Sequence, residues 1–446
     1  MRIVIAGAGE VGTHLARMLS NVNHEVTIID EDPRKLEEIA ATTDVLSVEG
    51  DFTTFSVLNK ASARKADLFM AVSQDENANI LAASIAKNMG AKKAISRIDH
   101  NEYLQPGNKE IFLNMGIDYL FYPEQMAADE VINLLGHNRT SEFVDFSGGK
   151  LSLIVFKLDE SSPLVDNTLL DVTEDRTALK YRTVAISRGG ETIIPRSHDD
   201  FRVGDMIYVI AHEDAVDEVL AFSGKSKIDI KNVMILGGSR IGIAVARTMQ
   251  NHANVKLIEY KEEKAYKLTE LLEKTLIIHE DGRNTDAIMD EGLGNMDAFV
   301  SVTGRSETNI LTAMLAKRMG VKKVIAAVEN LNYINLAESI GIDTIINKKR
   351  ITASNIFRFT MNTDVQAIKC LTGSDAEVLE FIAKPDSAVT KAPIKDLNFP
   401  KDSIIGGIVR GDEAFIAVGS FEIRSYDRVV VFALPDAISN IGKFFN

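Results

Sequence analysis

Residues 2–12 read Arg-Ile-Val-Ile-Ala-Gly-Ala-Gly-Glu-Val-Gly, and residues 233–242 read Val-Met-Ile-Leu-Gly-Gly-Ser-Arg-Ile-Gly. In both stretches a short apolar run predicts a buried parallel strand, and the glycine-rich loop after it opens a helical pattern. A glycine loop between a strand and a helix is typical of dinucleotide-binding folds. The chain therefore begins such a fold twice, which predicts an internal duplication.

The likeness between the two halves continues well beyond the glycine loops. Residues 67–73 (Asp-Leu-Phe-Met-Ala-Val-Ser) match residues 297–303 (Asp-Ala-Phe-Val-Ser-Val-Thr). Residues 79–90 match residues 309–320, and both stretches begin Asn-Ile-Leu and end Met-Gly. Strand and helix patterns alternate throughout, so we predict an α/β fold in which helices cover both faces of a parallel sheet.

A smaller segment with a different rhythm follows each of these large domains. Residues 184–191 and 407–412 each run from a strand into a tight glycine turn, and short strands and a closing helix come after them. This pattern predicts a small α+β domain. The expected order is a Rossmann-like domain at 1–138, its small domain at 139–225, a second Rossmann-like domain at 226–365 and its small domain at 366–446.

Composition excludes several classes of protein. The 446 residues, 45% of them hydrophobic, can bury more than one core, and the formal net charge of −14 argues against a nucleic-acid partner. No apolar run approaches the roughly 18 to 20 residues that span a bilayer. Residue 2 already lies in the first expected strand, so we expect no signal peptide and a cytosolic protein that reaches a membrane only through a partner. The single cysteine, Cys370, excludes internal disulfides and a thiolate metal site.

The three glycines of the first loop have different predicted structural roles. Gly7 permits the tight turn, Gly9 lets the backbone approach a pyrophosphate, and Gly12 lets the helix pack closely on the sheet. Asp30, the acid that ends the next strand, can accept both hydroxyls of an adenosine ribose and would repel a 2′-phosphate. We therefore expect NAD or an adenine nucleotide rather than NADP. A glycine loop that holds no ligand is the alternative.

The second loop differs where Ser239 replaces Gly9. The serine Cβ and hydroxyl crowd the place of a phosphate, although the hydroxyl could instead donate to it. Glu259 ends the second strand of this half and matches Asp30. A second site that is altered and one that holds no ligand both stay open.

Two further positions make the halves electrostatically unlike. Arg97 ends a strand at the carboxyl edge, where ligands bind in open α/β sheets, and its counterpart is Ala327. Glu124 is matched by Lys349. We expect the two sites to differ in ligand or in affinity. The plainer interpretation is that Arg97 and Glu124 are exposed charges at strand ends.

The sequence favours ligand sensing over catalysis. Hydride transfer needs an acid, a base or a polarising group beside the nicotinamide, and no convincing candidate is present. Tyr260 and Lys264 have the spacing used by short-chain dehydrogenases, but they fall where the adenosine ribose would lie, so we interpret the spacing as chance. The eight histidines show no metal-ligand spacing. Companion domains of about 80 residues are too small for a substrate domain.

The chain resembles the TrkA family, the cytosolic regulatory subunits of bacterial Trk potassium-uptake systems. The most telling stretches are residues 1–12, 48–51, 71–74, 77–79, 122–125 and 404–411, together with the doubled large-small order. The resemblance implies two tandem RCK units (regulator of potassium conductance), each a Rossmann-like domain with a small α+β domain. It also implies NAD(H) and ATP/ADP as ligands. The expected assembly is a homo-oligomer, a tetramer with a ring of eight RCK units, that docks on the inner face of the membrane on a multi-span potassium pore of TrkH type.

By position, the resemblance carries nucleotide contacts onto both halves. Glu124 matches a family glutamate near phosphates or a divalent ion, which often reaches a neighbouring subunit. We hypothesise that ligand charge beside Glu10, Arg97 and Glu124 sets the angle between RCK units. No catalytic or metal-ligating residue is expected. The expected contacts are Gly7, Ala8, Gly9, Glu10, Val11, Gly12, Asp30, Asp51, Phe52, Ser73, Gln74, Arg97 and Glu124 in the first half, and Gly237, Gly238, Ser239, Arg240, Ile241, Glu259, Asp281 and Thr303 in the second.

Other functions stay open on the sequence alone. The membrane partner decides whether the chain serves potassium uptake or another cation transporter, such as an antiporter or a potassium efflux channel. An NAD-dependent oxidoreductase and a purely structural scaffold are the alternatives from other classes. Consumption of NADH with a keto substrate identifies the first, and a lack of stabilisation by nucleotides identifies the second.

Overall fold

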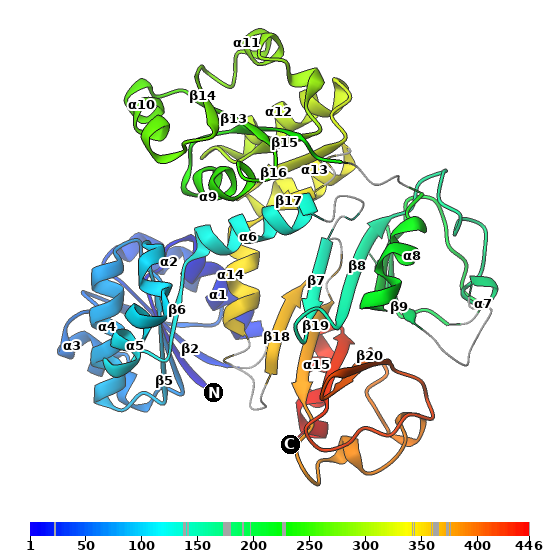
Figure 1. The fold of residues 1–446 in the computed structure, drawn as a ribbon. Helices are drawn as coiled ribbons and strands as arrows, with labels where there is room; N and C mark the ends of the chain where they lie inside the picture. The colour runs from blue at the N-terminus through cyan, green and yellow to red at the C-terminus, as the bar shows by residue number, and fades with distance from the viewer. Residues whose placement is uncertain are drawn as a thin grey trace. The chain divides into compact units, whose positions relative to one another are not determined.

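The computed structural model describes residues 1–21, 24–136, 140, 142–172, 180–189, 191–196, 198–224, 229–340, 342, 344–357, 359, 365–371, 374 and 376–445. They form two compact units, residues 1–127 with 348–360 and residues 128–347 with 361–446. The chain is drawn in Figure 1. Some predicted features lie outside the described residues: Gly190 of the first glycine turn, Gly341 and Asp343, which match Gly116 and Asp118 of the first half, and the domain boundaries expected at 138/139 and 225/226.

The first unit is built on a six-stranded parallel sheet in the order β3-β2-β1-β4-β5-β6. Its central strand β1 (Arg2–Ala6) is buried from Ile3 onward, as expected for a sheet covered on both faces. The chain leaves β1 for β2 and β3 on one side and returns to β4 on the other, which makes a switch point between β1 and β4. The other strands are β2 (Glu25–Asp30), β3 (Leu46–Glu49), β4 (Leu68–Ala71), β5 (Lys93–Arg97) and β6 (Tyr119–Phe121).

Helices alternate with these strands, and their ends follow local signals. Asp75 caps α4, since its carboxylate accepts hydrogen bonds from the N–H groups of Asn77 and Ala78, and Gly90 (φ +127°) ends the helix. The helices are α1 (Glu10–Asn21), α2 (Pro33–Ala40), α3 (Phe55–Lys60), α4 (Glu76–Met89), α5 (Pro106–Asn114) and the start of α6 (Pro123–Gly136), with 3₁₀ turns at Ala63–Lys65 and Asn101–Leu104.

One more helix belongs to the first unit. Helix α14 (Lys348–Phe357) packs against α1, although in sequence it follows the last strand of the second large sheet. Figure 1 shows α14 in yellow beside the blue α1. The sequence assigned this helix to the domain at 226–365, and the structure places it in the first unit. Residues of the second half therefore lie beside the first glycine loop.

The second unit contains a large parallel sheet that repeats the first, in the order β14-β13-β12-β15-β16-β17. Its strands are β12 (Asn232–Leu236), β13 (Asn254–Glu259), β14 (Thr275–His279), β15 (Ala298–Ser301), β16 (Lys323–Ala327) and β17 (Thr344–Ile346). Its helices are α9 (Arg240–Met249), α10 (Glu262–Leu271), α11 (Thr285–Asp290), α12 (Ser306–Arg318) and α13 (Ile334–Ser339), with 3₁₀ turns at Leu293–Asn295 and Leu331–Tyr333.

The same unit contains two small antiparallel sheets, ordered β10-β9-β11-β8-β7 and β18-β19-β22-β20-β21. The first has β7 (Glu142–Phe146), β8 (Leu151–Lys157), β9 (Tyr181–Arg188), β10 (Glu191–Ile193), β11 (Met206–His212), α7 (Leu169–Val172), α8 (Val216–Ala221) and a 3₁₀ turn at Glu213–Ala215. The second has β18 (Val365–Cys370), β19 (Glu377–Ile382), β20 (Ser403–Arg410), β21 (Glu413–Ile416), β22 (Arg428–Ala433), α15 (Pro435–Phe445) and 3₁₀ turns at Ala388–Thr390 and Ile394–Asp396.

The two small sheets share one core. A single apolar cluster takes buried residues from both of them. Glycines in β20 allow the close approach, because a Cβ on Gly406 would lie 2.7 Å from Ile210 and a Cβ on Gly407 would lie 2.6 Å from Leu151. Arg182 of β9 donates a hydrogen bond to the carbonyl of Ala417 at 2.7 Å. The small domains therefore pack on each other rather than standing apart.

Matching ion pairs confirm that the small domains are repeats. Arg188 makes a two-bond pair with Asp205 (2.8 and 2.7 Å), and Arg410 makes the same pair with Asp427 (2.9 and 2.7 Å). The predicted class is thus confirmed: two parallel-sheet Rossmann-like domains and two small α+β domains. Among the helices of the described residues, none is both long and apolar enough to cross a membrane.

Candidate functional site

The first glycine loop joins β1 to α1 and leaves room for a ligand. Gly7 has a φ of +106°, and a Cβ there would lie 2.9 Å from the backbone N of Ser73. A Cβ on Gly12 would lie 1.9 Å from the carbonyl O of Gly7, whereas a Cβ on Gly9 would meet nothing within 4 Å. The space beside Gly9 lies at the N-terminus of α1, where free N–H groups and the helix dipole favour an anion.

Asp30 ends β2, and its carboxylate is held against the loop. Its Oδ2 accepts a hydrogen bond from Ala8 N (2.7 Å), and its Oδ1 accepts one from Asp32 N (2.9 Å). Lys35 pairs with Oδ1 at 3.4 Å. These contacts orient the carboxylate and leave lone pairs for ribose hydroxyls. Lys35 was not among the predicted site residues, although Glu259 and Lys264 repeat the spacing of Asp30 and Lys35.

The loop after β4 borders the glycine loop on its other side. Asn79, fully buried in α4, accepts hydrogen bonds from Ser73 N (2.9 Å) and Oγ (2.8 Å) and donates one to the carbonyl of Arg97 (3.3 Å). The neighbouring Gln74 is exposed. The role of Asn79 was missed, and the repeated Asn-Ile-Leu could have indicated it, because Asn309 makes equivalent contacts in the second half.

Other predicted contacts of the first half are placed around this loop. Asp51 is exposed, and its Oδ1 accepts hydrogen bonds from the backbone N (2.8 Å) and hydroxyl (2.7 Å) of Thr53. It follows Gly50, whose N–H donates to the carbonyl of Asp30 at 3.0 Å. Phe52 packs against the apolar core and Val11 is buried, so both support the site more than they face it.

Arg97 and Glu124 come together at the end of β5. Arg97 Nη2 lies 3.1 Å from Asp99 Oδ1 and 3.6 Å from Glu124 Oε1. The side chains of Arg97 and Glu124 are only 12% and 11% exposed, so they are not exposed charges at strand ends. Among the described residues, neither Arg97 Nε nor Glu124 Oε2 has a hydrogen-bond partner. Buried polar atoms left in this state mark a place where a polar ligand can bind.

Two lysines at the start of α14 reach the same cluster. Lys348 Nζ lies 3.1 Å from Glu124 Oε1, and Lys349 Nζ lies 3.4 Å from the carboxylate of Glu10. Lys349 was expected to belong to the second site as the counterpart of Glu124, and that expectation is wrong because the residue lies in the first unit. Its side chain is 14% exposed. The first glycine loop is thus flanked by cations from a distant stretch of sequence.

The second loop repeats the geometry of the first. Gly237 has a φ of +107°, and Glu259 accepts hydrogen bonds from Gly238 N (3.1 Å) and Lys261 N (3.0 Å) while pairing with Lys264 at 3.2 Å. Ser239 caps α9, since its Oγ accepts a hydrogen bond from Gly242 N at 3.2 Å. The hydroxyl proton stays available to a ligand, so the serine is compatible with a phosphate beside it.

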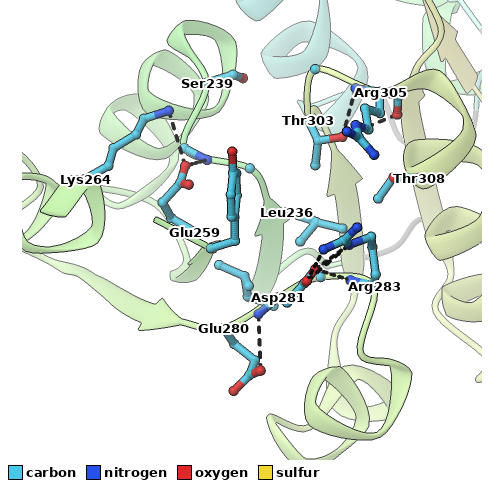
Figure 2. Close-up of a pocket in the computed structure, with 16 residues that line it drawn as sticks. Leu236, Ser239, Glu259, Lys264, Glu280, Asp281, Arg283, Thr303, Arg305 and Thr308 are labelled. Carbon is cyan, nitrogen blue, oxygen red and sulfur yellow. Dashed lines mark hydrogen bonds and ion pairs between the residues drawn. The ribbon is translucent and has the colours of Figure 1, made fainter. Parts of the chain in front are cut away.

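A pocket of about 340 Å³ opens at this second loop (Figure 2). The guanidinium of Arg283 donates hydrogen bonds to both carboxylate oxygens of Asp281 and holds the pKa of that carboxyl below its usual range. The predicted contacts Arg240 and Ile241 lie in α9 and do not line the pocket. The lining residues are Leu236, Gly237, Gly238, Ser239, Ile258, Glu259, Tyr260, Lys264, Glu280, Asp281, Gly282, Arg283, Thr303, Gly304, Arg305 and Thr308.

Tyr260 and Lys264 both line this pocket, and Lys264 lies on the same side as Glu259 (Figure 2). Lys264 forms an ion pair with Glu259, and Tyr260 is 60% exposed. Since Glu259 lies beside the glycine loop, the pair lies where a ribose would bind. This placement agrees with the interpretation of their spacing as chance.

Comparison with known proteins identifies the family of this chain. The TrkA-N domain model matches residues 3–123 and 233–348, and the TrkA-C domain model matches residues 153–224 and 378–446. The chain belongs to the TrkA family. The two TrkA-N matches cover the two large sheets, and the two TrkA-C matches cover most of the two small ones.

TrkA relatives match over the full length of the chain. The Trk system potassium uptake protein TrkA homolog of Archaeoglobus fulgidus is 34% identical over 447 residues, with all of both chains covered. The Trk system potassium uptake protein TrkA of Vibrio alginolyticus is 31% identical over 453 residues, covering all of this chain and 98% of its own. Among solved structures, the GsuK channel bound to NAD has a TM-score of 0.63 and 13% identity, with 100% of this chain and 78% of that chain covered. This last likeness shows the fold.

Proposed function

We propose that this chain is a nucleotide-sensing regulatory subunit of a potassium-uptake system. One observation carries the proposal: a chain whose full-length relatives are Trk system potassium uptake proteins builds the same acid-on-loop site twice. Asp30 is bound to Ala8 N, and Glu259 is bound to Gly238 N. Each site offers a ribose acceptor and a phosphate-binding helix N-terminus together.

The ligands of the proposal are NAD(H) and ATP/ADP. The open space beside Gly9 leaves room for a phosphate group to approach the backbone, because even a Cβ there would meet nothing within 4 Å. Asp30 would hold the adenosine ribose, and Arg97, whose Nε has no hydrogen-bond partner among the described residues, would face the ligand's other half. The solved GsuK channel, which shares the fold, is bound to NAD.

Control of a membrane pore then follows from linkage. A nucleotide changes the opening of a pore only if it binds two arrangements of the protein with different affinity. The charges that a ligand meets at the first site are Glu10, Arg97 and Glu124, joined by Lys348 and Lys349. We propose that ligand charge at this cluster sets the arrangement, and that the partner is a multi-span potassium pore of TrkH type on whose cytosolic face the chain docks.

Self-assembly is part of the same proposal. Leu81 in α4 and Leu311 in α12 hold matching positions and are 50% and 65% exposed. Ile111 in α5 and Leu336 in α13 match likewise, at 58% and 56% exposed. Exposed apolar side chains that recur in both halves favour an interface used by both. We propose that further copies of this chain cover these helices, in a tetramer that carries eight RCK units.

We also propose that bound NAD(H) is a signal and not a substrate. Incubation with NADH and a range of keto acids should leave the NADH absorbance unchanged. Steady consumption of NADH would favour an oxidoreductase. Another cation transporter as partner is the remaining alternative, and purification of the tagged chain from its native membrane identifies which pore accompanies it.

The direct test is calorimetry on the full-length chain with Asp30→Ala. Loss of the ribose acceptor should weaken NADH at the first site at least about tenfold, because the carboxylate makes charge-assisted bonds to the ligand. A matched Asp44→Ala change, at an aspartate outside the site, should leave affinity as it is. Unchanged affinity in Asp30→Ala would remove the role given to Asp30. If NADH, ATP and ADP all leave the unfolding temperature unchanged, the chain is better explained as a purely structural scaffold.

A further inference from the structure

Arg305 lines the second pocket, and its guanidinium has no partner among the described residues. Lys264 pairs with Glu259, and Arg283 pairs with Asp281. Among the described residues, the guanidinium of Arg305 makes no hydrogen bond or ion pair. In the first half the same position holds an acid, which caps a helix. A free positive charge in this pocket is therefore specific to the second half.

Arg305 lies beside the place where a phosphate would bind. A Cβ on Gly237 would lie 3.0 Å from Thr303 N, so the loop after β15 touches the glycine loop. Arg305 follows in that loop, with its N–H donating to Thr303 Oγ1 at 3.3 Å. Figure 2 shows Arg283 and Arg305 on the side of the pocket opposite Glu259. A ligand with its ribose on Glu259 would extend its phosphates toward Arg305.

The pocket ends where the second half of a dinucleotide would begin. Its lining residues come from the ends of β12, β13, β14 and β15 and the segments that follow them, and none of the described residues of β16 or beyond lines it. At the end of β16, Ala327 is 4% exposed and Val328 is fully buried. The corresponding end of β5 carries Arg97 in the first unit. A dinucleotide spans both halves of such a sheet, so the second pocket covers only its adenosine half.

We propose that the second site binds an adenosine 5′-polyphosphate, with its ribose on Glu259 and its terminal phosphate on Arg305, while the first site binds NAD(H). This inference rests on the proposed nucleotide-sensing function. It explains why one half keeps Arg97 at its outer strand and the other half places its free cation at the loop after β15. The two sites of one chain then respond to different nucleotides.

Calorimetry on the full-length protein tests the assignment. NADH should bind once per chain, and protein saturated with NADH should still bind one ADP per chain. Arg305→Gln should weaken that ADP about tenfold or more and leave NADH affinity unchanged, because only the terminal phosphate loses a charged partner. Arg318→Gln is the matched control, since it removes an exposed arginine from the other end of the same helix.

The possible outcomes separate this inference from the proposed function. NADH binding twice per chain, or displacing all bound ADP, would overturn the assignment of the second site and leave the proposed function standing. Equal ADP affinity in Arg305→Gln and the parent protein would overturn the role of Arg305. No binding of either nucleotide would overturn the proposed function and this inference with it.

Discussion

His14 belongs to α1, the helix on which α14 packs, and its ring is partly buried near three cations. Burial is the main cause that lowers its pKa from 6.5 to about 4, and Arg350, Lys349 and Arg17 lower it further. The neutral imidazole is therefore the form that suits the folded chain at neutral pH. Two of the three cations come from α14, so the titration of this residue reports on the packing of that helix.

The depressed pKa of His14 predicts a loss of stability in acid. Between pH 6.5 and about 4, the unfolded chain binds a proton at this residue that the folded chain does not, so the free energy of unfolding falls as the pH is lowered through that window. From about pH 7 to about pH 5 this residue alone accounts for roughly 2 kcal/mol. His14→Gln should remove that part of the pH dependence, measured by urea unfolding across the window. His252 is exposed, so His252→Gln is the control. An equal effect of His252→Gln would contradict the role given to His14.

Helix α14 packs in a different unit from the strand that precedes it in the sequence. The helix follows β17 in the chain, yet it is part of the first unit, and its residue Ile356 is fully buried. Ile356→Ala should therefore destabilise the first unit by about 2–4 kcal/mol, because a buried cavity is left behind. Hydrogen exchange measures the effect: amides of α1 should exchange faster, while those of β12 should keep their protection.

A change of the same kind in α13 provides the control. Ile334 is buried in the core of the second large sheet, so Ile334→Ala should speed exchange there and leave α1 protected. Faster exchange in α1 from both variants would mean that the two helices do not belong to separate units. Unchanged exchange in α1 after Ile356→Ala would contradict the placement of α14.

The packing of α14 on the first unit could not be predicted from the sequence, for a physical reason. Strands, glycine loops and their acids were predictable because a buried parallel strand, a turn and a helix start leave local patterns. The start of α14, Lys348 and Lys349, carries no local sign of which unit it packs on, since that is decided by tertiary contacts. For the same reason, matching the two halves residue by residue assigned Lys349 to the second site, although it lies in the first unit. The sequence left open whether Ser239 crowds a phosphate or donates to it, and its use as a helix cap depends on a rotamer that the sequence does not reveal.

At the scale of the whole chain, duplication has been followed by divergence of the sites. Both halves retain the acid on the glycine loop, so both retain the means to hold a ribose. They differ in the charges placed beyond it, Arg97 in one and Arg305 in the other. Two unlike sites in one chain affect each other only if both ligands bias the same rearrangement, and that coupling is reciprocal. ADP affinity measured with and without NADH gives its size directly.

Assembly of copies is a property of the whole chain, and it can be tested without touching either site. Leu81→Glu and Leu311→Glu place a charge in the exposed apolar faces of α4 and α12, so burying either face against another copy would leave an unpaired carboxylate. Each variant should lower the mass of the assembly seen by sedimentation, and the double variant should lower it further. Leu271→Glu, at an equally exposed leucine of α10 that has no leucine counterpart in the first half, should leave the mass unchanged. Because neither face contains a predicted nucleotide contact, NADH and ADP should still bind to the smaller species. A double variant that keeps the full mass would mean that copies meet through another surface.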